Sequence, residues 1–192
     1  MREPIRSTRA GEAVFSACGR YRYRLGRRWS AEGGDVVWIM LNPSRADAGT
    51  DDPTIRRCIA FSRHWGYGGM VVVNLFALCA THPAALHGVP DPVGPENDAH
   101  IAAAFRGADG SASSGPDIVA AWGAHPTASG RAALVLAMAG DSVRCLGTTR
   151  SGHPRHPLYV AAGQSRLDLV PAGIGVRPVP RASAALPAAA AS

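Results

Sequence analysis

Residues 36–44 read Val36-Val-Trp-Ile-Met-Leu-Asn-Pro-Ser44, and this stretch decides the fold class. Six consecutive apolar residues, β-branched at the start, predict a strand that is buried on both faces and ends at the Asn-Pro pair. A helix start follows at Asp52-Pro53, with aspartate as the N-cap and proline at the first helical position. A doubly buried strand followed by a helix is typical of a parallel sheet.

The same alternation continues outward from this stretch. Toward the C-terminus, apolar runs predict further strands and helical spacing predicts helices. The strands are expected at 70–73, 117–121 and 143–146, and the helices at 53–65, 95–106 and 127–139. Toward the N-terminus, residues 20–29 alternate arginine with aromatic or apolar side chains, which predicts an edge strand whose arginine face is solvated or rests on phosphate. The expected fold is α/β: a three-layer α/β/α sandwich with a mostly parallel four-stranded central sheet and this edge strand.

The composition bounds the domain organisation. With 192 residues, 46% of them hydrophobic and 18% charged, the chain suits one globular domain. We expect a flexible lead-in over residues 1–13, a single α/β domain over 14–170, and a partly disordered Pro/Ala-rich tail over 171–192. No apolar run approaches the ~18 residues of a membrane helix, and the start shows no signal peptide pattern. A cytoplasmic protein without a membrane partner is expected.

The charged residues exclude some chemistry and permit other chemistry. The net charge is +6, and all 20 basic residues are arginine. Without lysine, Schiff-base chemistry on a lysine amine is impossible within this chain. Guanidinium groups suit phosphate and carboxylate, so the charge permits a nucleic-acid partner without proving one. The four cysteines lack zinc-site spacing, and P-loop, dinucleotide-binding and nucleophile-elbow motifs are missing. We therefore expect no metal and no cofactor.

Polar or small residues follow four of the predicted strands. Because the carboxyl ends of parallel strands meet at one edge of a sheet, we expect these residues to share a cleft. Each also has a structural interpretation: either asparagine can be a turn or strand-terminating residue, and either histidine can be structural. The residues are Asn42-Pro43-Ser44, Asn74, Trp122-Gly123, and His153 and His156 in the last loop.

Three aspartates follow the first buried strand, and they are expected to differ in role. Asp52 is the predicted N-cap, so Asp51 is left free to face the cleft and to activate water. Asp47 is expected either to solubilise the loop or to assist as a base. In the last loop, Arg150 and Arg155 flank the histidines and can hold phosphate.

Taken together, the motifs of the chain resemble a bacterial domain family of unknown function, numbered 1643. The resemblance covers about Tyr21 to Leu158 and implies kinship without an activity. The motifs that carry it are Ile39-Met-Leu-Asn-Pro-Ser44, Asp51-Asp-Pro-Thr-Ile-Arg-Arg57, Trp65-Gly-Tyr-Gly68, Val73-Asn-Leu-Phe-Ala77, Gly94-Pro-Glu-Asn-Asp98, Ala121-Trp-Gly123 and Gly152-His-Pro-Arg-His-Pro-Leu-Tyr159.

The order of the motifs also resembles the uracil-DNA glycosylase superfamily. In that superfamily a first strand ends in a short Asn-Pro or Asp-Pro loop that positions water, and a second ends in an asparagine that reads the base. A later strand ends in Trp-Gly, and a His-Pro loop follows the last strand. The matching places here are Asn42-Pro43, Asn74, Trp122-Gly123 and His153-Pro154. Two departures are Arg155 in place of a serine, and Asn42 where some members have a water-activating acid.

This second resemblance implies a metal-independent, monofunctional DNA-glycosylase-like hydrolase of DNA repair, which cleaves the N-glycosidic bond of a flipped base. DNA rather than RNA, or a nucleotide, is the expected partner. Two alternatives stay open: a non-catalytic module that binds nucleic acid or a nucleotide, and a hydrolase or transferase acting on free nucleosides or nucleotides. The implied residues are Asn42, Asp51 and His153 for catalysis, Pro43, Ser44, Asn74, Phe76, Trp122, Gly123 and His156 for base contacts, and Arg150 and Arg155 for phosphate.

Overall fold

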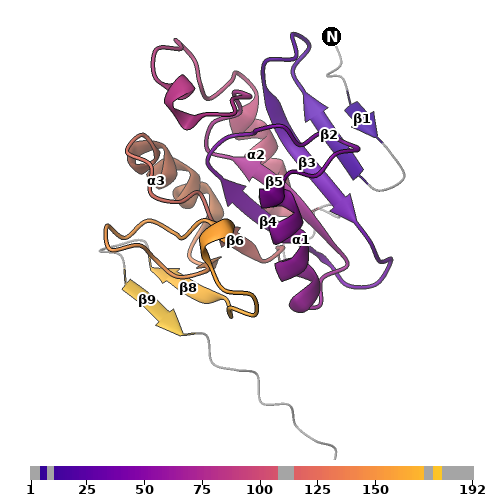
Figure 1. Ribbon diagram of the computed structural model, residues 1–192, viewed down its shortest axis with the longest axis vertical. Helices are drawn as coiled ribbons and strands as arrows, with labels where there is room; N and C mark the ends of the chain where they lie inside the picture. The colour runs from indigo at the N-terminus through magenta and orange to yellow at the C-terminus, as the bar shows by residue number, and fades with distance from the viewer. Residues whose placement is uncertain (1–4, 8–10, 108–114, 171–174, 179–192) are drawn as a thin grey trace, which may run out of the picture.

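The computed structural model describes residues 5–7, 11–107, 115–170 and 175–178. Figure 1 shows the elements in space. In chain order they are β1 (Ile5–Ser7), β2 (Gly11–Phe15), β3 (Arg22–Arg28), β4 (Asp35–Met40), α1 (Pro53–His64), β5 (Gly69–Asn74), η1 (Pro83–Leu86), α2 (Asn97–Arg106), β6 (Ile118–Ala120), α3 (Ala128–Ala139), β7 (Val143–Cys145), η2 (Pro157–Tyr159), β8 (Leu167–Val170) and β9 (Gly175–Pro178). Among these, no helix is long and apolar enough to cross a membrane.

The described strands form one nine-stranded mixed sheet. Its order is β1-β2-β3-β5-β4-β6-β7-β8-β9. The four strands in the middle, β5, β4, β6 and β7, run parallel, and the outer strands on both sides pair antiparallel. The α/β class predicted from the sequence is therefore confirmed, while the predicted size of the sheet is wrong because further strands extend it at both sides.

The N-terminal part of the chain differs from the prediction. The strand expected at an edge is β3, and it lies inside the sheet between β2 and β5. Residues 5–7 and 11–13, placed in a flexible lead-in, belong to β1 and β2. These strands are short and depend on pairing, β1 with β2 and β2 with β3, so their own sequence carries little pattern. Of the expected Pro/Ala-rich tail, residues 175–178 form β9, and the rest lies outside the described residues.

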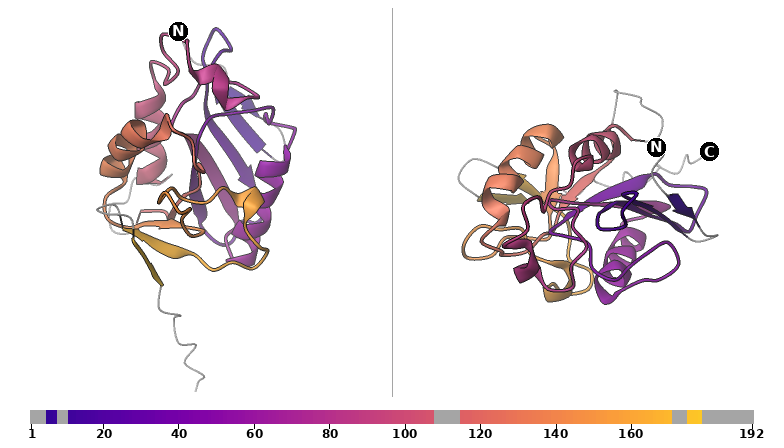
Figure 2. Two further views of the ribbon diagram at one scale, coloured as in Figure 1. Left: turned by 60° about the vertical axis from the view of Figure 1, so that its left-hand side comes forward. Right: turned by 90° about the horizontal axis from the view of Figure 1, so that it is seen from above.

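Alternate residues of β4 build two separate cores. Val36, Trp38 and Met40 pack on the side of α1, in a cluster that includes Ile55 and Phe61. Val37 and Ile39 point to the other side, where α2 and α3 contribute Ile101 and Val135. Figure 2 shows α1 on one face of the sheet and α2 and α3 on the other. Burial on both faces explains why this strand is continuously apolar in sequence.

The N-terminus of α1 is fixed by its first residues. The Asp52 carboxylate accepts a hydrogen bond from the Ile55 amide at 2.8 Å, and Pro53 supplies a preset φ at the first helical position. An N-cap of this kind contributes about 1 kcal/mol to helix stability. The cap also holds the Asp52 carboxylate beside the carboxyl ends of the parallel strands, where the candidate site lies.

Candidate functional site

A cavity of about 380 Å³ lies at the carboxyl edge of the parallel strands. This volume is within the usual range of small-molecule sites, roughly 300–1,000 Å³. Its lining comes from β3, β4, β5, the N-terminus of α1 and the loops after β6 and β7. The polar and aromatic members include Arg22, Asn42, Ser44, Asp52, Asn74, Trp122, His125, His156 and Tyr159. The structure thus brings together Asn42, Asn74 and Trp122, which the sequence placed at one sheet edge.

Asn74 carries an amide without partners. The residue is 1% exposed, and neither its Oδ1 nor its Nδ2 has a hydrogen-bond partner among the described residues. Its backbone is fixed, because the Asn74 backbone carbonyl accepts a hydrogen bond from the side-chain Nδ2 of the buried Asn97 at 3.0 Å. Leaving a buried polar group unpaired costs roughly 1–3 kcal/mol, so such a group calls for an explanation. A ligand that offers one donor and one acceptor would satisfy both atoms.

Asn42 has less freedom than its place in the sequence suggested. Its Nδ2 donates to the Pro43 carbonyl at 3.0 Å and to the Ala80 carbonyl at 2.8 Å. These bonds tie the Asn-Pro turn to the chain that follows β5. Only the Asn42 Oδ1 is left to meet a ligand or a water, and it can only accept a hydrogen bond. Pro43 contributes its carbonyl to this turn and does not line the cavity.

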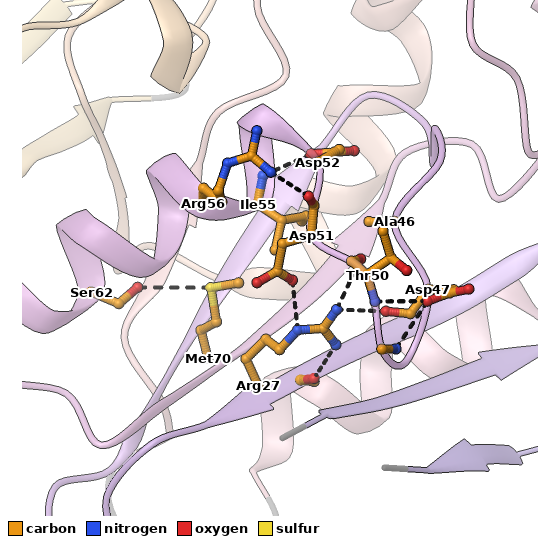
Figure 3. Close-up of polar contacts among 12 residues, drawn as sticks. Arg27, Ala46, Asp47, Thr50, Asp51, Asp52, Ile55, Arg56, Ser62 and Met70 are labelled. Atoms are coloured by element: carbon orange, nitrogen blue, oxygen red, sulfur yellow. Dashed lines mark hydrogen bonds and ion pairs between the residues drawn. The ribbon is translucent and has the colours of Figure 1, made fainter. Parts of the chain in front are cut away.

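Of the two neighbouring aspartates, Asp52 is the N-cap as predicted, but it also takes the cavity position expected of Asp51. Asp51 accepts from the Arg27 Nε at 2.8 Å and does not line the cavity, so its predicted position is wrong. Asp52 caps α1 and lines the cavity as well. Figure 3 shows Asp51 turned toward Arg27 and Asp52 at the start of the helix. The physical reason is the buried Arg27 guanidinium, which takes the nearer carboxylate as its ion-pair partner.

The two histidines of the last loop lie in different places. His156 lines the cavity, whereas His153 lines a second, mostly apolar cavity of about 430 Å³ against α3. Burial lowers the pKa of His156, and the nearby Asp52 charge offsets part of this effect. The His156 Nδ1 accepts from the Leu158 amide at 3.4 Å, so the neutral ring carries its proton on Nε2. The expectation that His153 shares a cleft with the asparagines is wrong.

Contacts from α1 hold this loop in place. Arg57 donates to the Val160 carbonyl at 2.5 Å and to the Pro157 carbonyl at 3.4 Å. Gly123, with a φ of 77°, brings its backbone against His156, because an added Cβ would lie 3.3 Å from the His156 Cβ. The position of His156 therefore depends on contacts that no local pattern in its own loop encodes.

A protein-family model matches residues 22–158 of the chain, and the family is described as Protein of unknown function (DUF1643). The matched range contains every residue that lines the cavity except Tyr159. The chain belongs to this family. No curated protein and no solved structure matches it.

In this DUF1643 chain, some of the remaining predicted site residues line the cavity and others do not. Ser44, Trp122 and Gly123 line the cavity, and the Trp122 Nε1 is buried without a partner. Phe76, expected to stack on a base, is instead part of the core on the side of α2 and α3, because the chain turns into that core after β5. Within the described residues, no three His, Cys, Asp or Glu side chains gather as a metal site would require.

The arginines expected to hold phosphate do not line the cavity. Arg150 and Arg155 are exposed, and the Arg155 Nε donates to the Thr148 carbonyl at 3.2 Å. The arginine that does line it is Arg22 of β3, which sequence reasoning placed on a solvated or phosphate-bearing face. Arg22 is buried beside the loop that follows β4, where its Nη1 donates to the Ala46 carbonyl, whereas Arg24 and Arg28 of the same strand are not buried. The sequence carries no signal for this, since its charged and apolar alternation is that of an edge strand.

Proposed function

We propose that the cavity binds a single nucleobase of a flipped nucleotide and that the protein hydrolyses its N-glycosidic bond, as in the uracil-DNA glycosylase superfamily that the motif order resembles. The observation that carries this proposal is the Asn74 amide, buried without partners in a cavity of about 380 Å³. A fixed amide pairs with a base edge that offers a donor and an acceptor side by side. The orphaned atoms of Asn74 fit such an edge.

The reaction needs a group that stabilises the leaving base. As the bond between C1′ and the base nitrogen breaks, its electron pair moves onto the base and raises the negative charge on a carbonyl oxygen of the base. His156 can donate its Nε2 proton in a hydrogen bond to that oxygen, because its lowered pKa keeps the ring neutral. One donor placed in this way contributes roughly 3–4 kcal/mol to transition-state stabilisation.

The reaction also needs a positioned water. The water oxygen forms the new bond to C1′, and its proton passes to the Asp52 carboxylate. The Asn42 Oδ1 accepts the other water hydrogen and orients the nucleophile, since the Asn42 Nδ2 is already engaged. The proposal therefore gives Asp52 and His156 the roles that the sequence assigned to Asp51 and His153.

Base release from DNA tests the proposal. The full chain is incubated with single- and double-stranded oligonucleotides that carry different normal and deaminated bases, and abasic sites are detected as alkali-labile breaks. We expect release of one base or a small group of bases, and a loss of about 100-fold or more in Asn74→Ala. No abasic sites with any substrate, or full activity in Asn74→Ala, would contradict the proposal.

A further inference from the structure

Arg22 is an interior cation with little to balance it. The residue is 3% exposed, and its Nη1 donates to the Ala46 carbonyl. Its Nε is buried without a partner, and no hydrogen bond or ion pair of its Nη2 is found among the described residues. Burial lowers the pKa of Arg22 to about 10, so the group stays charged at neutral pH. A buried charge without a counter-ion is costly.

The neighbouring groups do not supply the missing partner. Asp52, which lines the same cavity, and Asp47 both raise the pKa of Arg22 through their charges, but Arg22 forms no ion pair with either within the described structure. The Nε and Nη2 atoms form one edge of the guanidinium plane. Such an edge matches two oxygens of a phosphate or a carboxylate.

We propose that Arg22 binds an anionic group of the ligand, a phosphate attached to the nucleoside whose base Asn74 contacts. This inference rests on the proposed function and names the substrate class more narrowly: a phosphorylated nucleotide, free or within a strand, and not a free base or a nucleoside. Arg22 is a binding residue in this scheme. Trp122, which lines both this cavity and the apolar one against α3, also has a buried Nε1 without a partner among the described residues.

Paired ligands test the inference. Affinities of the full chain are measured by calorimetry for each nucleoside and its 5′-monophosphate, and for a short single strand of the same base. We expect the phosphorylated member to bind about tenfold or more tightly, because hydrogen bonds to charged groups are the strong ones. Tighter binding of the strand than of the monophosphate assigns the phosphate to a polynucleotide, and the reverse assigns it to a free nucleotide. Equal affinities for nucleoside and nucleotide would overturn the inference.

Variants on the same strand provide the control. Arg22→Met should remove the preference for phosphate, so that each nucleoside and its monophosphate bind with similar affinity. Arg24→Met removes the same charge from β3 at a position outside the cavity, paired with Glu12, and should keep the preference. If Arg22→Met does not fold, Arg22→Lys retains the charge without the fork and should lower the preference. An unchanged preference in the Arg22 variants overturns the inference.

Inorganic phosphate separates this inference from the proposed function. It requires no base, and we expect it to raise the melting temperature of the wild type and of Arg24→Met but not of Arg22→Met. Stabilisation through Arg22 without base release would leave the anion site standing and the glycosidase rejected. Base release with no effect of Arg22 on phosphate or nucleotide binding would do the opposite.

Discussion

Arg22 and Arg27 lie five residues apart on β3, both buried, and both hold the loop 45–51 through its carbonyls, yet their surroundings differ. Arg27 uses all three nitrogens. It pairs with Asp51 at 2.8 Å and donates to the carbonyls of Gly26, Asp47 and Thr50. Arg22 uses one nitrogen, which donates to Ala46. A buried arginine whose nitrogens all have hydrogen-bond partners, such as Arg27, holds the structure together as a clamp. A buried arginine beside a cavity with an unpartnered nitrogen, such as Arg22, has a donor to offer to a ligand.

The room for the Arg27 clamp is made by β2. A Cβ added to Gly11 would lie 2.3 Å from the Arg27 Nη1 and 2.7 Å from the Ala48 carbonyl. The loop itself is closed by Asp47, whose Oδ1 accepts from the amides of Gly49 and Thr50 at 2.9 and 2.8 Å. Figure 3 shows these bonds at the Asp47 carboxylate, next to the hydrogen bonds of the Arg27 guanidinium. The clamp thereby fixes the chain that leads to Asp52 and the cavity.

The largest effect should come from a substitution in the cavity and should appear in the rate of base release. His156→Ala should lower base release by about 100- to 1,000-fold, because it removes the donor to the leaving base. His153→Ala, in the same loop but in the other cavity, should change it little. Single-turnover rates with saturating enzyme measure both variants. Equal losses in the two variants would mean that the loop, and not His156 itself, matters.

Substitution of Arg27 should change the stability of the protein more than substitution of Arg22. Arg27→Met should lower the free energy of unfolding by about 2–4 kcal/mol, since it removes the ion pair with Asp51 and the hydrogen bonds to three carbonyls. Arg22→Met should cost about 1 kcal/mol or less, because it removes a desolvated charge with one hydrogen bond. Urea unfolding of both variants measures the difference. Equal destabilisation would remove the distinction between the two arginines.

Crowding the clamp should have a smaller effect. Gly11→Ala should destabilise the protein by about 1–3 kcal/mol, the usual cost of overpacking. Gly26→Ala serves as the matched control on β3, because the nearest atom to its added Cβ lies at an ordinary 3.8 Å. Thermal unfolding of the two variants should separate them. A neutral Gly11→Ala would show that the loop can shift without cost.

The smallest effect should be a pH dependence from the cavity. The pKa of His156 is lowered in the folded protein, so below its ordinary value of about 6.5 the unfolded chain binds the proton first. Stability should therefore fall as pH drops below about 6.5, by at most ~1.4 kcal/mol per pH unit for one proton. His156→Gln should flatten this part of the curve in urea titrations. An unchanged slope would mean that His156 is not the group responsible.

Much of the fold was accessible from sequence because the signals are local. The apolar run before Asn42, the Asp52-Pro53 helix start and the later apolar runs lie in β4, α1, β5, β6 and β7. The meeting of Asn42, Asn74 and Trp122 at one cavity followed from the rule that parallel strands share their carboxyl edge. Strand β2 was missed because five residues paired with β3 carry no period of their own.

What the sequence determined by itself was the order of the parallel strands and the α-helices and which residues follow each parallel strand, because hydrophobic period and helix capping act over a few neighbours. The tertiary structure decided the choice between Asp51 and Asp52, between His153 and His156, and the burial of Arg22. Each of these depends on a partner far along the chain: Arg27 for the aspartates, Arg57 and Gly123 for the histidine loop, and the Ala46 carbonyl for Arg22. Long-range packing selects among side chains that local patterns leave equivalent.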